Sequence, residues 1–162
     1  MPIVNTDIQF RLSGGASNSD PILSLGGIKS STAVTGSTIF DTVSGAESTA
    51  GDTEYRCIYV HNNHGTLTML SSKIWIQADN LSYISIALGG EGLNGTAETV
   101  VDESTAPIGE SFSAPANEGA SLSLGNIPAG QHYPIWVKRT VPPAAAAASG
   151  SFTLRVKCDT EA

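Results

Sequence analysis

Apolar and polar residues alternate along much of the chain with a period of two, the pattern of half-buried antiparallel strands. In the segment DIQFRLS, Ile8, Phe10 and Leu12 share one face while Gln9 and Arg11 share the other. The same alternation recurs at residues 82–88, 121–127, 133–141 and 151–158. Each segment is therefore predicted to be a strand with one buried face and one polar face.

Two further segments, RCIYV at 56–60 and KIWIQ at 73–77, carry more continuous apolar runs, which predict central strands covered on both faces. No segment shows apolar residues recurring with the 3.6-residue period of a helix. The alanine run at 144–148 is shorter than the roughly 12 residues that an isolated helix needs. We expect it to form a hairpin loop between strands ending at Val141 and starting at Ser151, and GGEGLNG at 89–95 to form another hairpin connection.

Residues 13–50 differ from the rest, because they are rich in Ser, Thr and Gly with isolated apolar residues between them. They are predicted to form an irregular arm, with one or two short strands, that contacts a neighbouring subunit. The chain is thus expected to be one structural domain with an N-terminal strand and extended arm at 1–50 and a β-sandwich body at 51–162. The predicted fold class is all-β: an antiparallel β-sandwich, immunoglobulin-like or jelly-roll.

Charged residues make up only 14% of the 162 residues, against roughly 25% in an ordinary soluble domain, and the net charge is −7. An acidic chain with 8 basic residues is a poor ligand for nucleic acid or for an anionic membrane. No segment approaches the length of a membrane span, and the N-terminus lacks the basic start and apolar core of a signal peptide. We expect the protein to be made in the cytoplasm.

The stretch GDTEYRCIYVHNNHG at 51–65 holds the residues that most resemble a chemical site, Cys57, His61 and His64. A metal site, or a nucleophile pair of Cys57 with His61 or His132, needs these side chains to converge on a third ligand or an orienting group. A strand followed by an Asn/Gly turn does not supply that convergence, and no CxxC or HExxH frame is present. We predict no catalytic residue, metal or cofactor, a buried unreactive Cys57, and free thiols at Cys57 and Cys158.

Two acidic stretches offer Asp41, Glu47, Asp52 and Glu54, and then Asp102 and Glu103. Their irregular spacing does not match a calcium-binding loop, so they are predicted to be solvated loop carboxylates. Asp52 or Glu54 is expected to form at most an exposed pair with Arg56, contributing about 1 kcal/mol or less. Trp75 and Trp136 both fall in the middle of predicted strands, one expected in the core and the other at a contact between subunits.

The order of strands and turns in the second half resembles immunoglobulin-like sandwiches of bacterial cell-surface and phage proteins. This resemblance rests on Asn63, Gly65, Pro128, Gly130, Gln131, Gly150 and Phe152, which mark fold and not function. A more specific resemblance covers most of the chain, from about Phe40 to Asp159. FDTVSGAESTAGDTEYRCIYVHN at 40–62, together with IPAGQHYPIWVKRTV at 127–141, is similar to virion structural proteins of tailed bacteriophages.

This second resemblance implies a non-enzymatic virion subunit that is made in the cytoplasm of a host bacterium. The leading hypothesis is a capsid decoration (cement) protein that binds and stabilises the shell of major capsid protein. A tail, baseplate or head–tail junction subunit is one alternative, a carbohydrate-binding β-sandwich another, and a cysteine- or metal-dependent enzyme a third. Expected partners are the major capsid protein and further copies of the chain, as a dimer or trimer, with no nucleic acid or membrane. The candidate contact residues are Ile8, Phe10, Ile22, Leu23, Leu25, Ile39, Phe40, Trp75 and Trp136.

Overall fold

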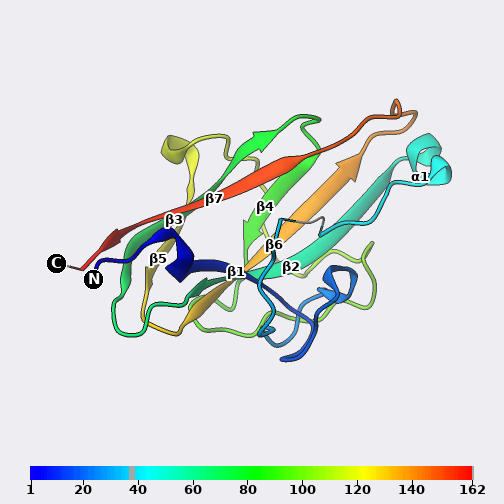
Figure 1. Cartoon of the computed structure of the whole chain (residues 1–162). Coiled ribbons are helices and arrows are strands. Elements are labelled where there is room, and N and C mark those ends of the chain that lie inside the picture. Colours follow the sequence, from blue (N-terminus) through cyan, green and yellow to red (C-terminus); the bar gives the residue numbers. More distant parts are fainter. Residues whose placement is uncertain (37–38, 162) are drawn as a thin grey trace.

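A computed structural model describes residues 1–36 and 39–161 and shows two antiparallel sheets packed face to face (Figure 1). The first sheet has the strand order β1-β2-β6-β4, and the second has the order β5-β3-β7. The strands are β1 (Ile8–Leu12), β2 (Asp52–Asn62), β3 (Met69–Asp79), β4 (Ile84–Leu88), β5 (Leu122–Ile127), β6 (His132–Val141) and β7 (Phe152–Thr160). The predicted all-β antiparallel sandwich is confirmed.

The main core lies between the inner faces of the two sheets. In β2 the even-numbered residues Ile58 and Val60 face the second sheet, and in β6 the odd-numbered residues Ile135 and Val137 do the same. Because β2 and β6 pair with Ile58 opposite Ile135, apolar side chains of neighbouring strands lie side by side. The buried members of this cluster are Ile39, Phe40, Ile58, Val60, Met69, Ile74, Ile76, Ile84, Ile86, Leu124, Ile127, Ile135 and Val137.

A second apolar cluster lies on the other face of the four-stranded sheet, beneath two irregular segments at 13–36 and 89–121. Its buried members are Cys57, Tyr59, Ala87, Ala97, Val100 and Trp136. The two segments also bond to each other, since the Gly27 N–H donates to the Ala97 carbonyl and the Val100 N–H to the Leu25 carbonyl, both at 2.9 Å. Strand β2 is therefore covered on both faces, as its continuous apolar run predicts.

Within the segment predicted to be an extended arm, residues 13–36 pack against the body of the same chain. The Ser30 N–H donates to the Leu12 carbonyl, and the Cys57 N–H donates to the Ser24 carbonyl, each at 2.8 Å. Leu25 packs against the second cluster. Folding back gives this segment both hydrogen-bond partners and apolar contacts within its own chain, which an extended arm would lack.

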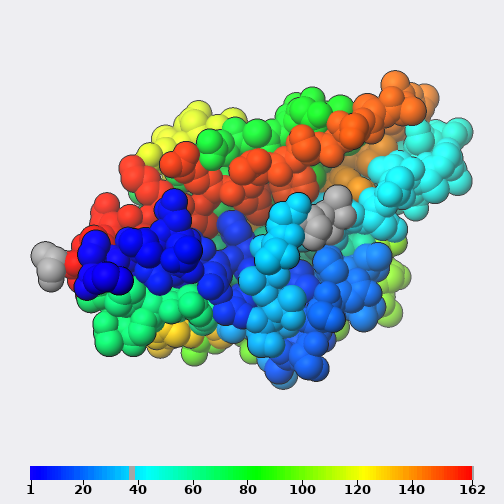
Figure 2. Space-filling model, in the orientation of Figure 1, coloured from blue at the N-terminus to red at the C-terminus, as the bar shows by residue number. Residues whose placement is uncertain are grey.

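One short helix, α1 (Gly45–Ala50), was not expected. Ser44 and Glu47 form a capping box at its start: the Glu47 N–H donates to the Ser44 hydroxyl at 3.3 Å, and the Ser44 N–H donates to the Glu47 carboxylate at 2.6 Å. The Ser48 hydroxyl donates to the Ala145 carbonyl at 2.7 Å. This bond holds α1 beside the connection between β6 and β7, as Figure 2 also shows.

The two connections predicted to be hairpins join different sheets. The alanine run leads from β6 in the first sheet to β7 in the second, and GGEGLNG begins the long path from β4 to β5. Alternation identifies a strand but not its partner, because the paired strands are distant in sequence. Within residues 1–36 and 39–161, no helix combines the length and apolar character needed to cross a membrane.

Candidate functional site

The cysteine and histidines that follow one another in β2 and its turn lie in different surroundings. Cys57 is fully buried in the second cluster, and this burial raises the pKa of its thiol above the ordinary value. His64 lies in the turn, where its Nδ1 accepts the backbone N–H groups of Thr66 and Leu67 at 3.1 and 2.9 Å. His61 lies on the same face of β2 as Cys57, near the C-terminal end of the strand. The predicted burial of Cys57 is confirmed, and His64 serves as a turn-forming side chain.

His61 and His132 face each other across the pairing of β2 with β6. His61 is 8% exposed, and the His132 ring meets the Tyr59 ring edge-on at 5.0 Å between centroids. Burial lowers the pKa of His61 to about 4, with a smaller contribution from nearby Lys29 and then Arg11. Burial also lowers the pKa of His132. Both imidazoles are therefore neutral at neutral pH.

Acidification is expected to weaken the fold through His61. Its pKa is lower in the folded chain (about 4) than its ordinary value of 6.5, so its contribution is complete above pH 6.5 and is lost as the pH falls towards 4. One such group changes the free energy of unfolding by up to about 1.4 kcal/mol per pH unit. Urea unfolding of wild type and His61→Gln between pH 4 and 7 measures this. A stability difference between them that stays constant with pH would contradict it.

A cluster of buried charges occupies one end of the sandwich interior. Glu54 is 2% exposed and Arg56 is 0% exposed, and both side chains extend from β2. Arg139 of β6 binds the Glu54 carboxylate through Nε at 2.6 Å and through Nη2. Arg56 Nη2 lies 2.5 Å from the Glu103 carboxylate, and Arg139 Nη1 donates to the Asp41 carbonyl at 2.7 Å. Two arginines thus link β2 and β6 to the segments that carry Asp41 and Glu103.

Phe40 adds an aromatic surface to this cluster. Its ring centroid lies 5.4 Å from the guanidinium carbon of Arg56 and 4.8 Å from that of Arg139, within the range of cation–π contacts. Arg56 Nε also donates to the Ile39 carbonyl at 3.1 Å. The Phe40 ring lies 6.3 Å from the Phe152 ring of β7. The segment starting at Ile39 is therefore held between the two sheets.

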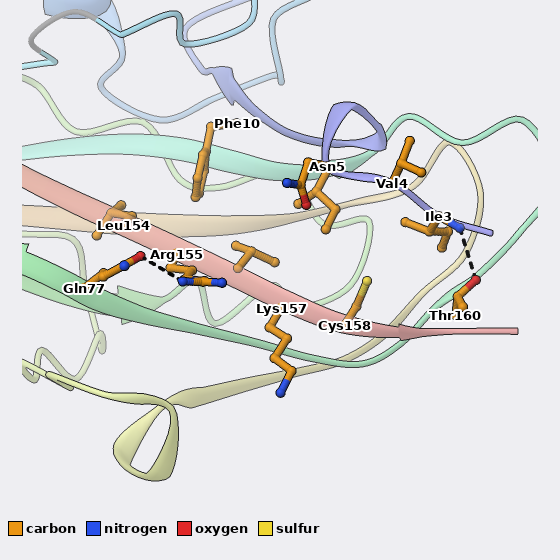
Figure 3. A pocket seen from close by; sticks show the side chains of 12 residues that line it. Ile3, Val4, Asn5, Phe10, Gln77, Leu154, Arg155, Lys157, Cys158 and Thr160 are labelled. Atoms are coloured by element: carbon orange, nitrogen blue, oxygen red, sulfur yellow. Dashed lines mark hydrogen bonds between the residues drawn. The ribbon is translucent and has the colours of Figure 1, made fainter.

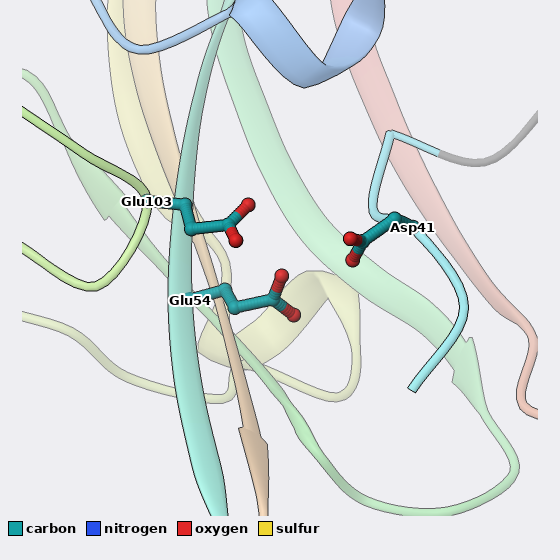
Figure 4. Close-up of side chains that lie close together, drawn as sticks. All are labelled: Asp41, Glu54 and Glu103. Atoms are coloured by element: carbon teal, nitrogen blue, oxygen red, sulfur yellow. The ribbon is translucent and has the colours of Figure 1, made fainter. Parts of the chain in front are cut away.

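The carboxylates of Asp41, Glu54 and Glu103 point towards a shared space, with ligand oxygens within 4.8 Å of one another (Figure 4). Each of them contacts an arginine, so guanidinium groups already supply positive charge there. Burial raises the pKa of Glu54 to about 7, against the opposing effect of Arg139. The prediction of solvated loop carboxylates is wrong for Glu54, which lies in β2 and is 2% exposed, and its pair with Arg56 is buried and not exposed as predicted. Asp41 and Glu103 are loop carboxylates, 39% and 35% exposed, that each pair with an arginine of the cluster.

The irregular outer layer keeps several large apolar side chains exposed. Val101 and Ile108 are each 85% exposed, and Ile28 is 60% exposed. Neighbouring residues of the same segments, including Val100, pack onto the sheet. The exposed members, called here the outer aliphatic surface, are Ile22, Leu23, Ile28, Leu93, Val101 and Ile108. This layer is therefore anchored on its inner side and apolar at many points on its outer side.

A groove of about 420 Å³ lies between the N-terminal segment and β7 (Figure 3). One side is lined by Ile3, Val4, Asn5, Ile8 and Phe10, and the other by Leu154, Val156, Cys158 and Thr160. The Ile3 N–H donates to the Thr160 hydroxyl at 3.2 Å at one end of the groove. The inward-facing side chains of β7 stay half-buried along it, because no described segment fills this space.

The nine candidate contact residues fall into three settings. Ile39 and Phe40 (4% exposed), Trp75 (7%) and Trp136 (0%) are buried; Ile8, Phe10 and Leu25 are half-buried; Ile22 and Leu23 are exposed on the outer aliphatic surface. The buried four contribute to the packing of their own subunit. Val101 and Ile108 were missed, because a single apolar residue in a loop gives no periodic signal.

Comparisons with models of protein families, with curated proteins and with solved structures found no match to this chain. The class of protein is defined by its fold: a two-sheet antiparallel β-sandwich with an irregular layer over one face.

Proposed function

We propose that this protein is a non-enzymatic structural subunit of a tailed-phage virion, a capsid decoration protein that binds and stabilises the shell of major capsid protein. The observation that carries a binding role is the outer aliphatic surface, where Val101 and Ile108 are each 85% exposed on segments anchored to the sheet. Exposed apolar groups on a layer that is packed against the sheet favour contact with another protein. The resemblance to phage virion proteins supports the choice of partner.

In this role the four-stranded sheet serves as the platform and the outer layer as the contact. Burying the exposed aliphatic side chains against the seams between capsid subunits would remove apolar area from water. Many copies bind one shell, so modest affinity for each copy is enough to resist internal pressure. The buried charge cluster would keep the outer layer fixed to the sheet, so that little ordering cost is left for binding.

A tail, baseplate or head–tail junction position is the second candidate, since the same sandwich and surface suit any symmetric assembly. Copy number separates the two: hundreds of copies in a particle indicate the shell, whereas about 3, 6 or 12 indicate the tail axis or a vertex. No observation favours carbohydrate binding. Trp136 is fully buried, and the ring of Trp75 lies below Arg155, whose guanidinium carbon is 5.8 Å from the ring centroid.

Introducing a charge into the outer aliphatic surface is expected to weaken capsid binding. Val101→Glu should lower the affinity for undecorated capsids by roughly tenfold, or about 1.4 kcal/mol, because the new carboxylate loses water without gaining a partner. Co-sedimentation of purified protein with capsids over a micromolar range measures this. Stability should not change, since Val101 is 85% exposed.

Ala147→Glu is the matched control, because it adds the same charge at an exposed position of the β6–β7 connection. It should bind capsids like wild type. Equal losses in the two variants would assign the effect to net charge and argue against the outer aliphatic surface. Failure of the wild-type protein to bind capsids at micromolar concentration would overturn the decoration role itself.

A further inference from the structure

Strand β7 is an edge strand, because the second sheet has the order β5-β3-β7 (Figure 1). Among the described residues, no backbone hydrogen bond joins residues 152–159 to any segment other than β3. Figure 2 shows this strand at the surface, with the N-terminal segment beside part of it. An unpaired edge of this length is a ready template for another strand.

The charges of this strand are arranged with opposite signs about Cys158. Arg155 and Lys157 precede it, and Asp159 and Glu161 follow it at the same spacings of one and three residues. When a strand pairs antiparallel with its own copy about a two-fold axis at Cys158, each residue lies opposite the one equally far beyond that axis. Lys157 then faces Asp159 of the second copy, and Arg155 faces Glu161 of the second copy.

Other centres do not give this match. A two-fold axis at Lys157 would place Lys157 opposite itself, and an axis at Val156 would place Arg155 opposite Lys157. Like charges directly opposite on paired strands are destabilising, whereas opposite charges stabilise the pair. The sequence of β7 thus selects both the partner, a second copy of this chain, and the register.

We propose that two copies of this chain associate through the free edges of β7, antiparallel and centred on Cys158, so that two three-stranded sheets join into one. This dimer would be one contact within the proposed virion assembly. Only its biological purpose rests on that assembly role. The half-buried inward face of β7 and the adjacent groove would gain cover from the second copy. A closed two-fold contact of this kind uses the same surface on both subunits.

Three of the four charged side chains already have contacts within their own chain that the pairing must share or replace. Glu161, one residue beyond the end of β7, accepts the Thr68 N–H at 3.2 Å, and Arg155 Nη1 donates to Gln77 Oε1 at 3.4 Å. Lys157 Nζ lies 2.8 Å from Glu118, and this pair is about half exposed on both sides, so it is easily shared or exchanged. Asp159 has no ion-pair partner within the described ranges. Docking would therefore supply Asp159 with a cation.

Charge reversal tests the proposal directly by multi-angle light scattering after size-exclusion chromatography. Wild type is expected to be dimeric at tens of micromolar. Lys157→Asp and Asp159→Lys should each be monomeric, because each places like charges opposite each other. A mixture of the two variants should dimerise, since the new carboxylate at position 157 of one chain then faces the new ammonium group at position 159 of the other. Circular dichroism checks that both variants remain folded.

Cys158 supplies a second readout that depends on register. Opposite residues in an antiparallel pair have Cα atoms about 4.5–5.5 Å apart, within the range a disulfide spans. Brief oxidation with copper–phenanthroline should therefore cross-link wild type into a covalent dimer and leave Cys158→Ser monomeric, since Cys57 is fully buried.

Three results would overturn the proposal: a monomeric wild type, dimers that persist in both single charge variants, or cross-linking that is unchanged in Cys158→Ser. None of these experiments contains capsids. A failed dimer would leave the capsid-binding result untouched, and a failed capsid assay would leave the dimer standing.

Discussion

Replacing Arg56 with alanine is expected to lower the free energy of unfolding by about 3–5 kcal/mol, the cost of breaking a buried ion pair by removing one partner. Arg56 is 0% exposed and contacts the carboxylates of Glu54 and Glu103 and the carbonyl of Ile39. Its loss leaves the Glu54 carboxylate, 2% exposed, with Arg139 as its remaining cation. Urea unfolding followed by tryptophan fluorescence measures the change.

The same change should loosen the segment that Arg56 holds. The Ile39 carbonyl loses its hydrogen bond from Arg56 Nε, and Phe40 loses one of its two cation–π contacts. Backbone amides of residues 39–50 are expected to exchange with solvent faster in Arg56→Ala than in wild type, while those of β3 change little under native conditions. An equal acceleration of amide exchange at residues 39–50 and in β3 would contradict a local effect of Arg56 on this segment.

Two variants distinguish the contribution of the buried charges to stability from that of an exposed ion pair. Glu118→Ala removes the exposed pair with Lys157 and should change the free energy of unfolding little, because water and salt screen an exposed pair. Arg56→Met combined with Glu54→Gln should cost less than Arg56→Ala alone, because methionine refills much of the buried volume and position 54 no longer carries a buried carboxylate that has lost one of its two cations. If Glu118→Ala is as destabilising as Arg56→Ala, the cluster has no special structural role.

The strands could be predicted because their signal is local. Alternation in YPIWVKRTV separates Ile135 and Val137, which face the main core, from Trp136, but Trp136 is buried in the second cluster, so β6 is covered on both faces there and not half-buried as predicted. The same rule assigns β7 its half-buried face. The α1 helix was missed although Ser44 and Glu47 carry the spacing of a capping box, because one helical turn shows no period. Pairing partners and the two irregular segments were not predictable, since they depend on contacts between residues distant in sequence.

The buried ion cluster has a signal in the sequence, although its members were predicted to be solvated. Alternation in β6 already places Arg139 on the inward face with Ile135 and Val137, and in β2 it places Glu54 and Arg56 on the face of Ile58. An inward charge in a strand needs an opposite charge nearby, because an unpaired buried charge is too costly. The contributions of Asp41 and Glu103 could not be foreseen, because both come from irregular segments that reach the cluster only in the folded chain.

Truncating Trp136 to alanine is expected to cost about 3–5 kcal/mol of unfolding free energy, the range measured for large buried aromatics. Trp136 is fully buried in the second cluster, with Ala97 and Val100 of the outer layer above the sheet. The cavity therefore opens between the sheet and the layer that carries Val101. Denaturant unfolding measures the global loss, and faster amide exchange at residues 96–101 would report the local one.

Trp136→Phe isolates packing from hydrogen bonding. Trp136 Nε1 is buried without a hydrogen-bond partner among the described residues, so phenylalanine removes volume but breaks no bond and should cost less than alanine. Trp75→Ala serves as the control on the second sheet: it should destabilise without changing exchange at residues 96–101. If Trp136→Ala also reduces capsid binding while Trp75→Ala does not, the outer layer must be held on the sheet to present its aliphatic residues. Unchanged capsid binding by Trp136→Ala, with faster exchange at 96–101, would show that this ordering contributes nothing to the contact.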